Sequence, residues 1–290
     1  MQEANFIEHQ VEIELDKVAK EEWSFLEKLR KDMRAAAATM TGEEARFLVD
    51  YYYILQKDRI RTSAQRKQLG DAEEPHMLIE WLSKNVRVLE NNVKSALGVY
   101  AESREEGRWA LAQHGIGPVI TAGLLAHVDI EKAKTVSALW RFAGQDPTSK
   151  WGKGEKRPWN ARLKVLCWHA GECFKRSSGS DKSYYGKVYR KHKERVVERN
   201  EAGGFSELAA KTLTEKKFKD KATKLIYESG KLPPGRLDLQ ATRKAVKRFL
   251  SHYWAVSYEV HHGMKAEDPW IIAHGGHEHI EAPPHWPISR

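Results

Sequence analysis

The chain has 290 residues, of which 41% are hydrophobic and ten are tryptophan, and this composition favours a folded protein with one large or two medium domains. No stretch approaches a membrane span of about 20 uninterrupted apolar residues, and the first residues lack the basic-then-apolar pattern of a secretion signal. The two cysteines, Cys167 and Cys173, suit neither a disulfide framework nor a metal site. These exclusions indicate a cytoplasmic protein without a membrane partner.

The net charge of +9 is distributed unevenly along the chain. Residues 141–250 hold 28 Lys and Arg against 12 Asp and Glu, whereas the rest of the chain holds 21 against 28. A basic block beside an acidic remainder is typical of a protein in which one part contacts a polyanion. A solvated, lysine-rich helical surface would give the same count, so the motifs in the block have to decide between the two.

Helical periodicity dominates residues 1–105. Apolar residues repeat at helical spacing from Val11 to Leu29, and Thr41-Gly-Glu-Glu44 has the form of a capping box that opens a second helix. A third run alternates at spacings of three and four residues from Ile79 to Tyr100, which predicts a coiled-coil seam. Such a seam requires a partner, either the first helix folded back or a second copy of the chain. We therefore expect residues 1–105 to form a helical coiled-coil arm that supports a homodimer.

The stretch His114–His127 has the pattern of a helix–hairpin–helix motif. Gly115, Ile116 and Gly117 form the predicted turn, and Pro118 opens the next helix, where its missing N–H costs nothing. Glycine is expected twice because a side chain would block close approach or forbid the dihedrals of the turn. Aligned N–H groups and the helix dipole then favour an anion, for which nucleic-acid phosphate is the usual ligand. A plain interhelical turn is the alternative interpretation.

A polar, basic loop over residues 145–158 follows a short predicted helix that Thr135 caps. Loops of this length are usually functional or disordered, and a second segment, 184–197, mixes cations with aromatic residues. Cations neutralise phosphates, and rings pack or stack on bases. The cations expected to contact nucleic acid are Lys150, Lys153, Lys156, Arg157, Arg162, Arg190, Lys191 and Lys193.

Further helices are predicted over 159–176, near 206–228 and over 239–262. Alternating β-branched residues, which would indicate strands, are missing from the sequence. The predicted fold class is therefore all-α, with a helix–hairpin–helix domain over 106–262 after the arm.

Residues 263–290 are predicted to form an irregular, histidine-rich tail. His274, His277 and His279 have a spacing that could bind zinc. The Gly and Pro residues around them favour a loop instead, so these histidines are weak metal candidates, and no cofactor is expected.

Several motifs occur in an order that is known from one protein family. Gly115-Ile-Gly-Pro118, then Ala138–Gly144, then Pro147 with a basic, glycine-containing loop, and then Arg157–Lys164 resemble the C-terminal domain of the bridge-RNA-guided insertion-sequence transposases. The resemblance covers residues 109–262 and rests on the order of the motifs. It implies a helical domain that engages DNA, in the context of a mobile element or a phage.

The chain also departs from that family. Its members carry an N-terminal nuclease-like domain with four metal-binding carboxylates, and a serine of the Pro-to-Asn loop attacks DNA. The first hundred residues here predict no strands on which such carboxylates could be mounted. Ser149 is the catalytic candidate, although the family's serine would stand nearer Trp151-Gly152, before a glycine.

The main hypothesis is a non-catalytic, dimeric relative of these transposases that binds duplex DNA, with structured RNA as another ligand. One alternative is a transposase or recombinase subunit in which Ser149 acts with carboxylates from another protein, since a hydroxyl needs activation. A second alternative is a helical scaffold whose basic block binds an acidic protein.

Overall fold

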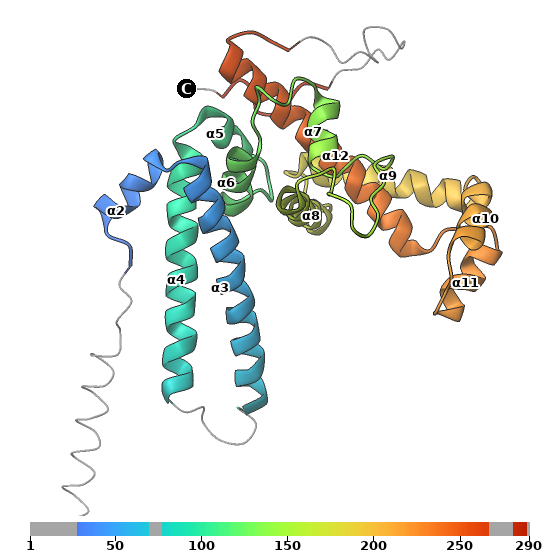
Figure 1. Cartoon of the computed structure of the whole chain (residues 1–290), viewed down its shortest axis with the longest axis horizontal. Helices are drawn as coiled ribbons and strands as arrows, with labels where there is room; N and C mark the ends of the chain where they lie inside the picture. Colours follow the sequence, from blue (N-terminus) through green and yellow to red (C-terminus); the bar gives the residue numbers. More distant parts are fainter. Residues whose placement is uncertain (1–27, 70–76, 267–280, 289–290) are drawn as a thin grey trace, which may run out of the picture. The chain divides into compact units, whose positions relative to one another are not determined.

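The structure, a computed structural model, describes residues 28–69, 77–266 and 281–288. Every regular element in these ranges is a helix, so the predicted all-α fold is confirmed. The chain divides into two compact units, Met1–Ser103 and Arg104–Arg290, whose helices are labelled in Figure 1. In the described part of the chain, no helix combines the length and the apolar composition needed to cross a membrane.

The first unit is built on two long helices, α3 (Gly42–Leu69) and α4 (Met77–Glu102), which pack along each other in opposite directions (Figure 1). The short helix α2 (Lys31–Ala36) and the 3₁₀ turn η1 (Ala37–Thr39) also contact α4. The predicted capping box of α3 is confirmed, because Glu44 N donates to Thr41 Oγ1 (3.2 Å) and Thr41 N donates to Glu44 Oε2 (2.7 Å).

The predicted seam of α4 is buried only towards its C-terminal end. Val93 and Tyr100 are buried, whereas Leu82 is 47% exposed. Within the described residues the main partner of α4 is α3, which was neither of the two partners expected from the heptads. Arg59 of α3 forms an ion pair with the buried carboxylate of Glu90 on α4 and so fixes the register of the two helices. The first predicted helix lies mostly outside the described residues.

The second unit is arranged around α12 (Pro234–His262). This helix packs against α5 (Glu105–Leu111), α7 (Val136–Phe142), α8 (Ala161–Arg176) and α9 (Tyr184–Glu201), while α6 (Pro118–His127) packs against α5 and α8. Phe249 of α12 lies at the centre of an aromatic core: its ring centroid is 5.9 Å from that of Trp109, 5.4 Å from Phe174 and 5.1 Å from Tyr185. Helices from both ends of the unit therefore share one core.

Short polar side chains determine where several helices begin. Thr135, Asn160, Ser183 and Asp220 each accept hydrogen bonds from backbone N–H groups in the first turns of α7, α8, α9 and α11. Asp220 explains why the single helix predicted near 206–228 is wrong: the chain forms α10 (Ser206–Glu215) and then α11 (Lys221–Glu228).

The start of α12 also differs from the predicted residue 239. This helix begins at Pro234, because proline is compatible with the first helical position. The interruption expected at Pro233-Pro234 is therefore the beginning of the helix.

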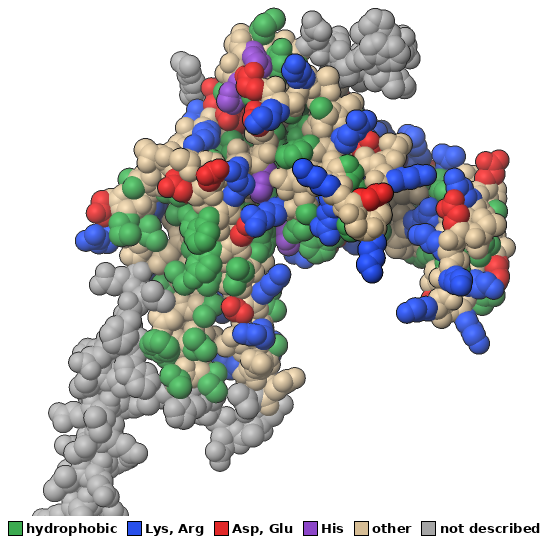
Figure 2. Space-filling model, viewed as in Figure 1, with side chains coloured by type: hydrophobic (Ala, Val, Ile, Leu, Met, Phe, Trp, Pro, Cys, Tyr) green, Lys and Arg blue, Asp and Glu red, His purple; other side chains and the backbone are tan. Residues whose placement is uncertain are grey.

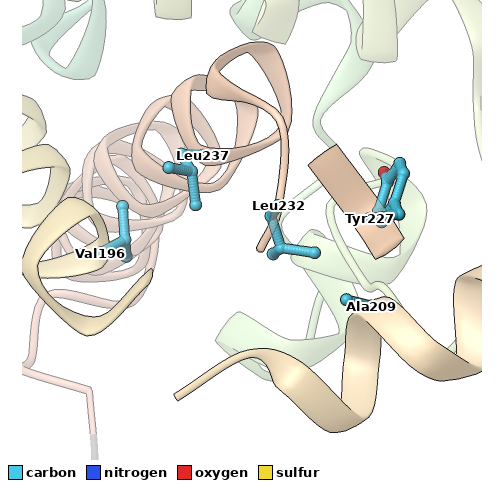
Figure 3. Packing of buried hydrophobic residues seen from close by; sticks show 5 residues of the cluster. All are labelled: Val196, Ala209, Tyr227, Leu232 and Leu237. Atoms are coloured by element: carbon cyan, nitrogen blue, oxygen red, sulfur yellow. The ribbon is translucent and has the colours of Figure 1, made fainter. Parts of the chain in front are cut away.

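Helices α10 and α11 form a small lobe on α9 and α12. Its buried core consists of Val196, Ala209, Tyr227, Leu232 and Leu237 (Figure 3). The side chain of Asn200 holds the segment that leads into α12. It accepts a hydrogen bond from Leu232 N (2.8 Å) and donates one to Leu232 O (3.2 Å).

One carboxylate joins α8, α9 and α12, and we call this group the Asp238 node. Lys175 Nζ lies 2.7 Å and Lys193 Nζ 2.6 Å from the carboxylate of Asp238, which also accepts a bond from the Tyr189 hydroxyl. Burial by itself would raise the pKa of Asp238, but the bonds from Lys175, Lys193 and Tyr189 lower it below its usual value. Asp238 is therefore charged, and two lysines are neutralised within the fold.

The described part of the tail, residues 281–288, has no helix and packs on the second unit. Pro284 O accepts a bond from Trp109 Nε1 (2.8 Å), and Trp286 Nε1 donates to Glu259 Oε2 (3.0 Å). His252 Nε2 lies 3.0 Å from Glu281 O, a carbonyl oxygen that can only accept, so Nε2 carries the proton. Burial lowers the pKa of His252 to about 4, which keeps this imidazole neutral.

Candidate nucleic-acid interface

The hairpin between α5 and α6 uses its two glycines differently. Gly115 has φ +92°, a conformation that other residues rarely adopt, and a side chain there would meet Cys173 at an ordinary contact distance of 3.5 Å. Gly117 has φ −109° and is followed by Pro118, the first residue of α6. A Cβ atom on Gly117 would meet nothing within 4 Å. The dihedrals of the turn therefore require glycine at Gly115 only, whereas the need for glycine at Gly117 to allow close approach of a ligand stays a prediction.

Buried apolar residues hold the hairpin against the core of the second unit. Ile116, Val119 and Ile120 are buried, whereas Gly115 is exposed and Gly117 half-buried. The anchored backbone leaves open space over Gly117 at the N-terminus of α6, where an anion would be favoured by the helix dipole.

Ser149 lies in a local turn that Asp146 organises. Asp146 Oδ1 accepts bonds from Thr148 N (2.9 Å) and Thr148 Oγ1 (2.7 Å), and Ser149 Oγ donates to Asp146 Oδ2 (3.3 Å). The bonds from Thr148 lower the pKa of Asp146, so its carboxylate is a weak base. A serine whose neighbour is a weak base is poorly activated as a nucleophile.

The described residues offer no group of metal-ligating side chains beside the serine. In residues 28–69, 77–266 and 281–288, His, Cys, Asp and Glu side chains form no group of three that could hold a metal ion. The predicted metal candidates His274, His277 and His279 lie outside these ranges.

The loop over 145–160 is ordered by two tryptophans and the cations that lie on them. Trp151 Nε1 donates to Glu155 O (2.7 Å), and its ring lies edge-on to Trp159 at 6.4 Å between centroids. The guanidinium of Arg157 lies 4.8 Å from the Trp151 centroid, and Lys164 Nζ lies 4.1 Å from that of Trp159. We call Arg157, Trp151, Trp159 and Lys164 the cation–tryptophan strip. It alternates positive charge with aromatic surface.

A second group of cations follows one side of α12 and reaches α8 and α9. We call it the basic band: Lys164, Arg195, Arg243, Lys244, Lys247 and Arg248. Lys247 Nζ lies 3.8 Å from the ring centroid of Trp140, whose Nε1 donates to Lys247 O (3.1 Å). Figure 2 shows Lys and Arg side chains spread over the region that Figure 1 labels α7, α9 and α12.

Burial, and then the charges of neighbouring cations, lower the pKa values of the three lysines in the basic band. Burial lowers the pKa of Lys164, and the charges of Arg243 and Arg157 lower it further. The pKa of Lys244 is lowered by burial and then by Arg248 and Arg195. Burial and Lys244 likewise lower the pKa of Lys247, against the opposing effect of Asp146. Cations that disfavour each other's charge create a positive potential that a polyanion would relieve.

The C-terminal segment supplies a carboxylate at one end of the basic band. Glu281 Oε2 lies 2.7 Å from Arg248 Nη1 and also accepts a bond from the Tyr184 hydroxyl. Burial raises the pKa of Tyr184 to about 12, and the bond to Glu281 contributes to this rise. This end of the band is thus partly neutralised, while Arg243 and Lys244 remain exposed.

The structure separates the cations that the sequence predicted as contacts into three groups. Lys193 belongs to the Asp238 node, where its charge is paired within the fold, and its contact with nucleic acid stays a prediction. Arg157 belongs to the strip and interacts with Lys164 of the band. The others are exposed on the loop, on the first turn of α8 or on α9: Lys150, Lys153, Lys156, Arg162, Arg190 and Lys191.

The cations of the basic band that lie on α12 were not among the contacts predicted from the sequence. Arg243, Lys244, Lys247 and Arg248 follow one another at helical spacing, and this pattern was the available signal. Its significance became visible only when the fold placed Lys164 of α8, Arg195 of α9 and the ring of Trp140 beside it.

Comparison of the chain with protein-family models, with curated proteins and with solved structures found no match. The resemblance to the transposase domain therefore stays a prediction from motif order.

Proposed function

We propose that this protein binds nucleic acid, and duplex DNA in particular, through the phosphate backbone. The observation that carries the proposal is the basic band, a group of six cations from α8, α9 and α12 whose mutual repulsion adds to burial in lowering the pKa values of its three lysines. Crowded cations destabilise a fold by mutual repulsion, so a surface that keeps them is explained by a ligand that neutralises them.

Two further features support a polymer of phosphates as the ligand. The open N-terminus of α6 beyond Gly117 offers backbone N–H groups, which favour phosphate. Exposed cations of the 145–160 loop extend the positive surface from α12. An extended positive surface matches a charged backbone better than it matches a small anion.

The test is a salt series with a blunt DNA duplex, measured by fluorescence anisotropy. Each phosphate contact adds about 0.9 to the slope of log affinity against log salt. The double variant Arg243→Gln/Lys244→Gln should lose about tenfold in affinity at low salt, with a slope reduced by about 1 to 2. The matched control Lys216→Gln/Lys217→Gln removes two exposed charges between α10 and α11 and should change little. Absent binding at low salt, or binding indifferent to salt, would contradict the proposal.

We further propose that the first unit supports a homodimer through an outward stripe of α3. Phe47 is 67% and Ile54 55% exposed, and the ring of Phe47 stacks on Tyr51 at 6.2 Å between centroids. Residues at spacings of three and four share one helix face, so these three form a continuous apolar stripe. Light scattering after size exclusion should show a dimer that Phe47→Ser/Ile54→Ser converts to a monomer. Ile60→Ser, at an exposed position off the stripe, is the control.

A further inference from the structure

Four of the eight large apolar side chains that are exposed in the described part of the second unit lie within a short part of the chain. Phe142 and Trp151 are each 42% exposed, and Val165 and Trp168 are each 52% exposed. All four lie between the end of α7 and the middle of α8, where cations are also concentrated. In Figure 2, hydrophobic and cationic side chains lie next to one another over this region. An apolar patch among cations indicates a contact surface rather than a purely solvated one.

Helical spacing extends the cation–tryptophan strip to Trp168. Trp168 follows Lys164 by four residues and Val165 by three, so its ring lies on the same exposed face of α8 as both of them. Lys164 lies on Trp159, which meets Trp151 edge-on. A row of aromatic surface and positive charge therefore runs from Arg157 to Trp168.

Within this row, Trp168 has the weakest structural reason to be aromatic. Trp151 is held by Glu155 and covered by Arg157, and Trp159 packs beside Gly144, so both rings help to order the loop. Trp168 is absent from the aromatic core and meets the ring of its neighbour His169 edge-on at 4.9 Å between centroids. Its half-exposed ring is thus available to a ligand.

We infer that the nucleic acid bound here carries unpaired nucleotides, and that Trp168 stacks on their bases, with Trp151 as a second ring further along the row. A duplex presents phosphates to a protein surface and hides the faces of its bases, so exposed rings would gain nothing from it. Unpaired bases expose those faces, and aromatic side chains between cations are the usual surface for them. The ligand that fits both surfaces is a duplex with a single-stranded tail: the basic band contacts the duplex backbone and the row contacts the tail.

This inference rests on the proposed function, and one experiment separates their failures. Binding of the full chain is measured by anisotropy with a blunt duplex and with the same duplex carrying a single-stranded tail that contains 2-aminopurine. The tailed duplex should bind about tenfold more tightly, as expected for one stacked base. Its 2-aminopurine fluorescence should fall on binding, because stacking on a ring quenches it.

Variants then assign the effect to the ring. Trp168→Ala should reduce the affinity for the tailed duplex to that for the blunt one and abolish the quenching, while the affinity for the blunt duplex is unchanged. Trp168→Phe, which keeps a ring, should restore most of the difference. Leu225→Ala removes a 64% exposed side chain of α11 and is the matched control.

Three outcomes would overturn the inference. Equal affinity for blunt and tailed duplexes would show that unpaired nucleotides are not bound, while leaving the proposed function intact. If Trp168→Ala binds the tailed duplex as tightly as the unmodified chain does, Trp168 is not part of the binding site. Loss of self-association in Trp168→Ala, without any effect on DNA, would assign the patch to a protein contact. If neither duplex binds, the proposed function itself has failed.

Discussion

Two groups of lysines on α8, α9 and α12 have opposite electrostatic surroundings. In the Asp238 node, Lys175 and Lys193 both lie within 2.7 Å of one carboxylate. In the basic band, burial and neighbouring cations lower the pKa values of Lys244 and Lys247, and the nearby carboxylates of Glu281 and Asp146 oppose this only in part. Lysine therefore joins packed helices in the Asp238 node and lies at the surface in the basic band. The partner, and not the number of charges, distinguishes a structural lysine from a binding one.

The largest expected effect on stability follows from disrupting the Asp238 node. Asp238→Asn removes the charge that two cations share and leaves them close together in a partly buried place. The free energy of unfolding should fall by about 3 kcal/mol, as when one partner of a buried ion pair is lost. Urea denaturation measures it. Asp181→Asn, whose carboxylate is almost fully exposed near Lys187, should change the stability by less than about 0.5 kcal/mol. Equal effects at the two positions would contradict the distinction.

A pH titration of stability tests the contact between α12 and the tail. His252 has a folded pKa of about 4 against an ordinary value near 6.5, so the fold requires the neutral imidazole. Stability from this group is fully present above about pH 6.5 and is lost as the pH falls towards 4. The loss should be about 2 kcal/mol over this window. His252→Gln should flatten the curve between these pH values, and an unchanged slope would show that another group titrates.

The hairpin contains a similar contrast, between a glycine that the backbone conformation requires and a glycine that faces open space. Gly115→Ala places a side chain at φ +92° and should cost about 1 kcal/mol of stability. Gly117→Ala meets no neighbour and should leave stability within about 0.5 kcal/mol, yet weaken DNA binding several-fold by covering the start of α6. Thermal unfolding and anisotropy on both variants check this. Gly117→Ala binding with full affinity would remove the hairpin from the interface.

The smallest effect concerns the band itself. Lys244→Gln relieves repulsion from Arg248 and Arg195, so the free protein should become more stable by a few tenths of a kcal/mol at low salt. The gain should vanish at high salt, since screening removes the repulsion that caused it. Denaturation at two salt concentrations measures the difference, and a loss of stability would show that Lys244 has a structural partner after all.

The sequence predicted the local features of the fold better than its long-range ones. The caps at Thr41 and Thr135 were visible because a cap and the helix that it opens are neighbours in the chain. The separation of α10 from α11 was missed, because the lysine-rich periodicity across Asp220 outweighed a single capping residue. The pairing of α4 with α3 could not be chosen from the heptads alone, since an apolar stripe does not specify its partner.

The candidate site was predicted as a region and not as a set of contacts. The excess of Lys and Arg over 141–250 indicated the basic surface, but Lys193 was assigned to it although Asp238, 45 residues later, neutralises it. Only the packing of α9 on α12 brings these two side chains together. Conversely, Lys164 and Arg243 are far apart in sequence and interact only because α8 also packs on α12. Spacing along one helix cannot reveal such pairs.

The bond from Trp109 to Pro284 joins residues that are 175 positions apart in the sequence. During synthesis the second unit cannot form this contact until nearly its whole length has left the ribosome, whereas the α3–α4 pair has all of its residues by Glu102. The two units should therefore fold at different times, the first early and from local contacts, the second late and from distant ones. The aromatic core around Phe249 would be the last part of the described chain to be shielded from water.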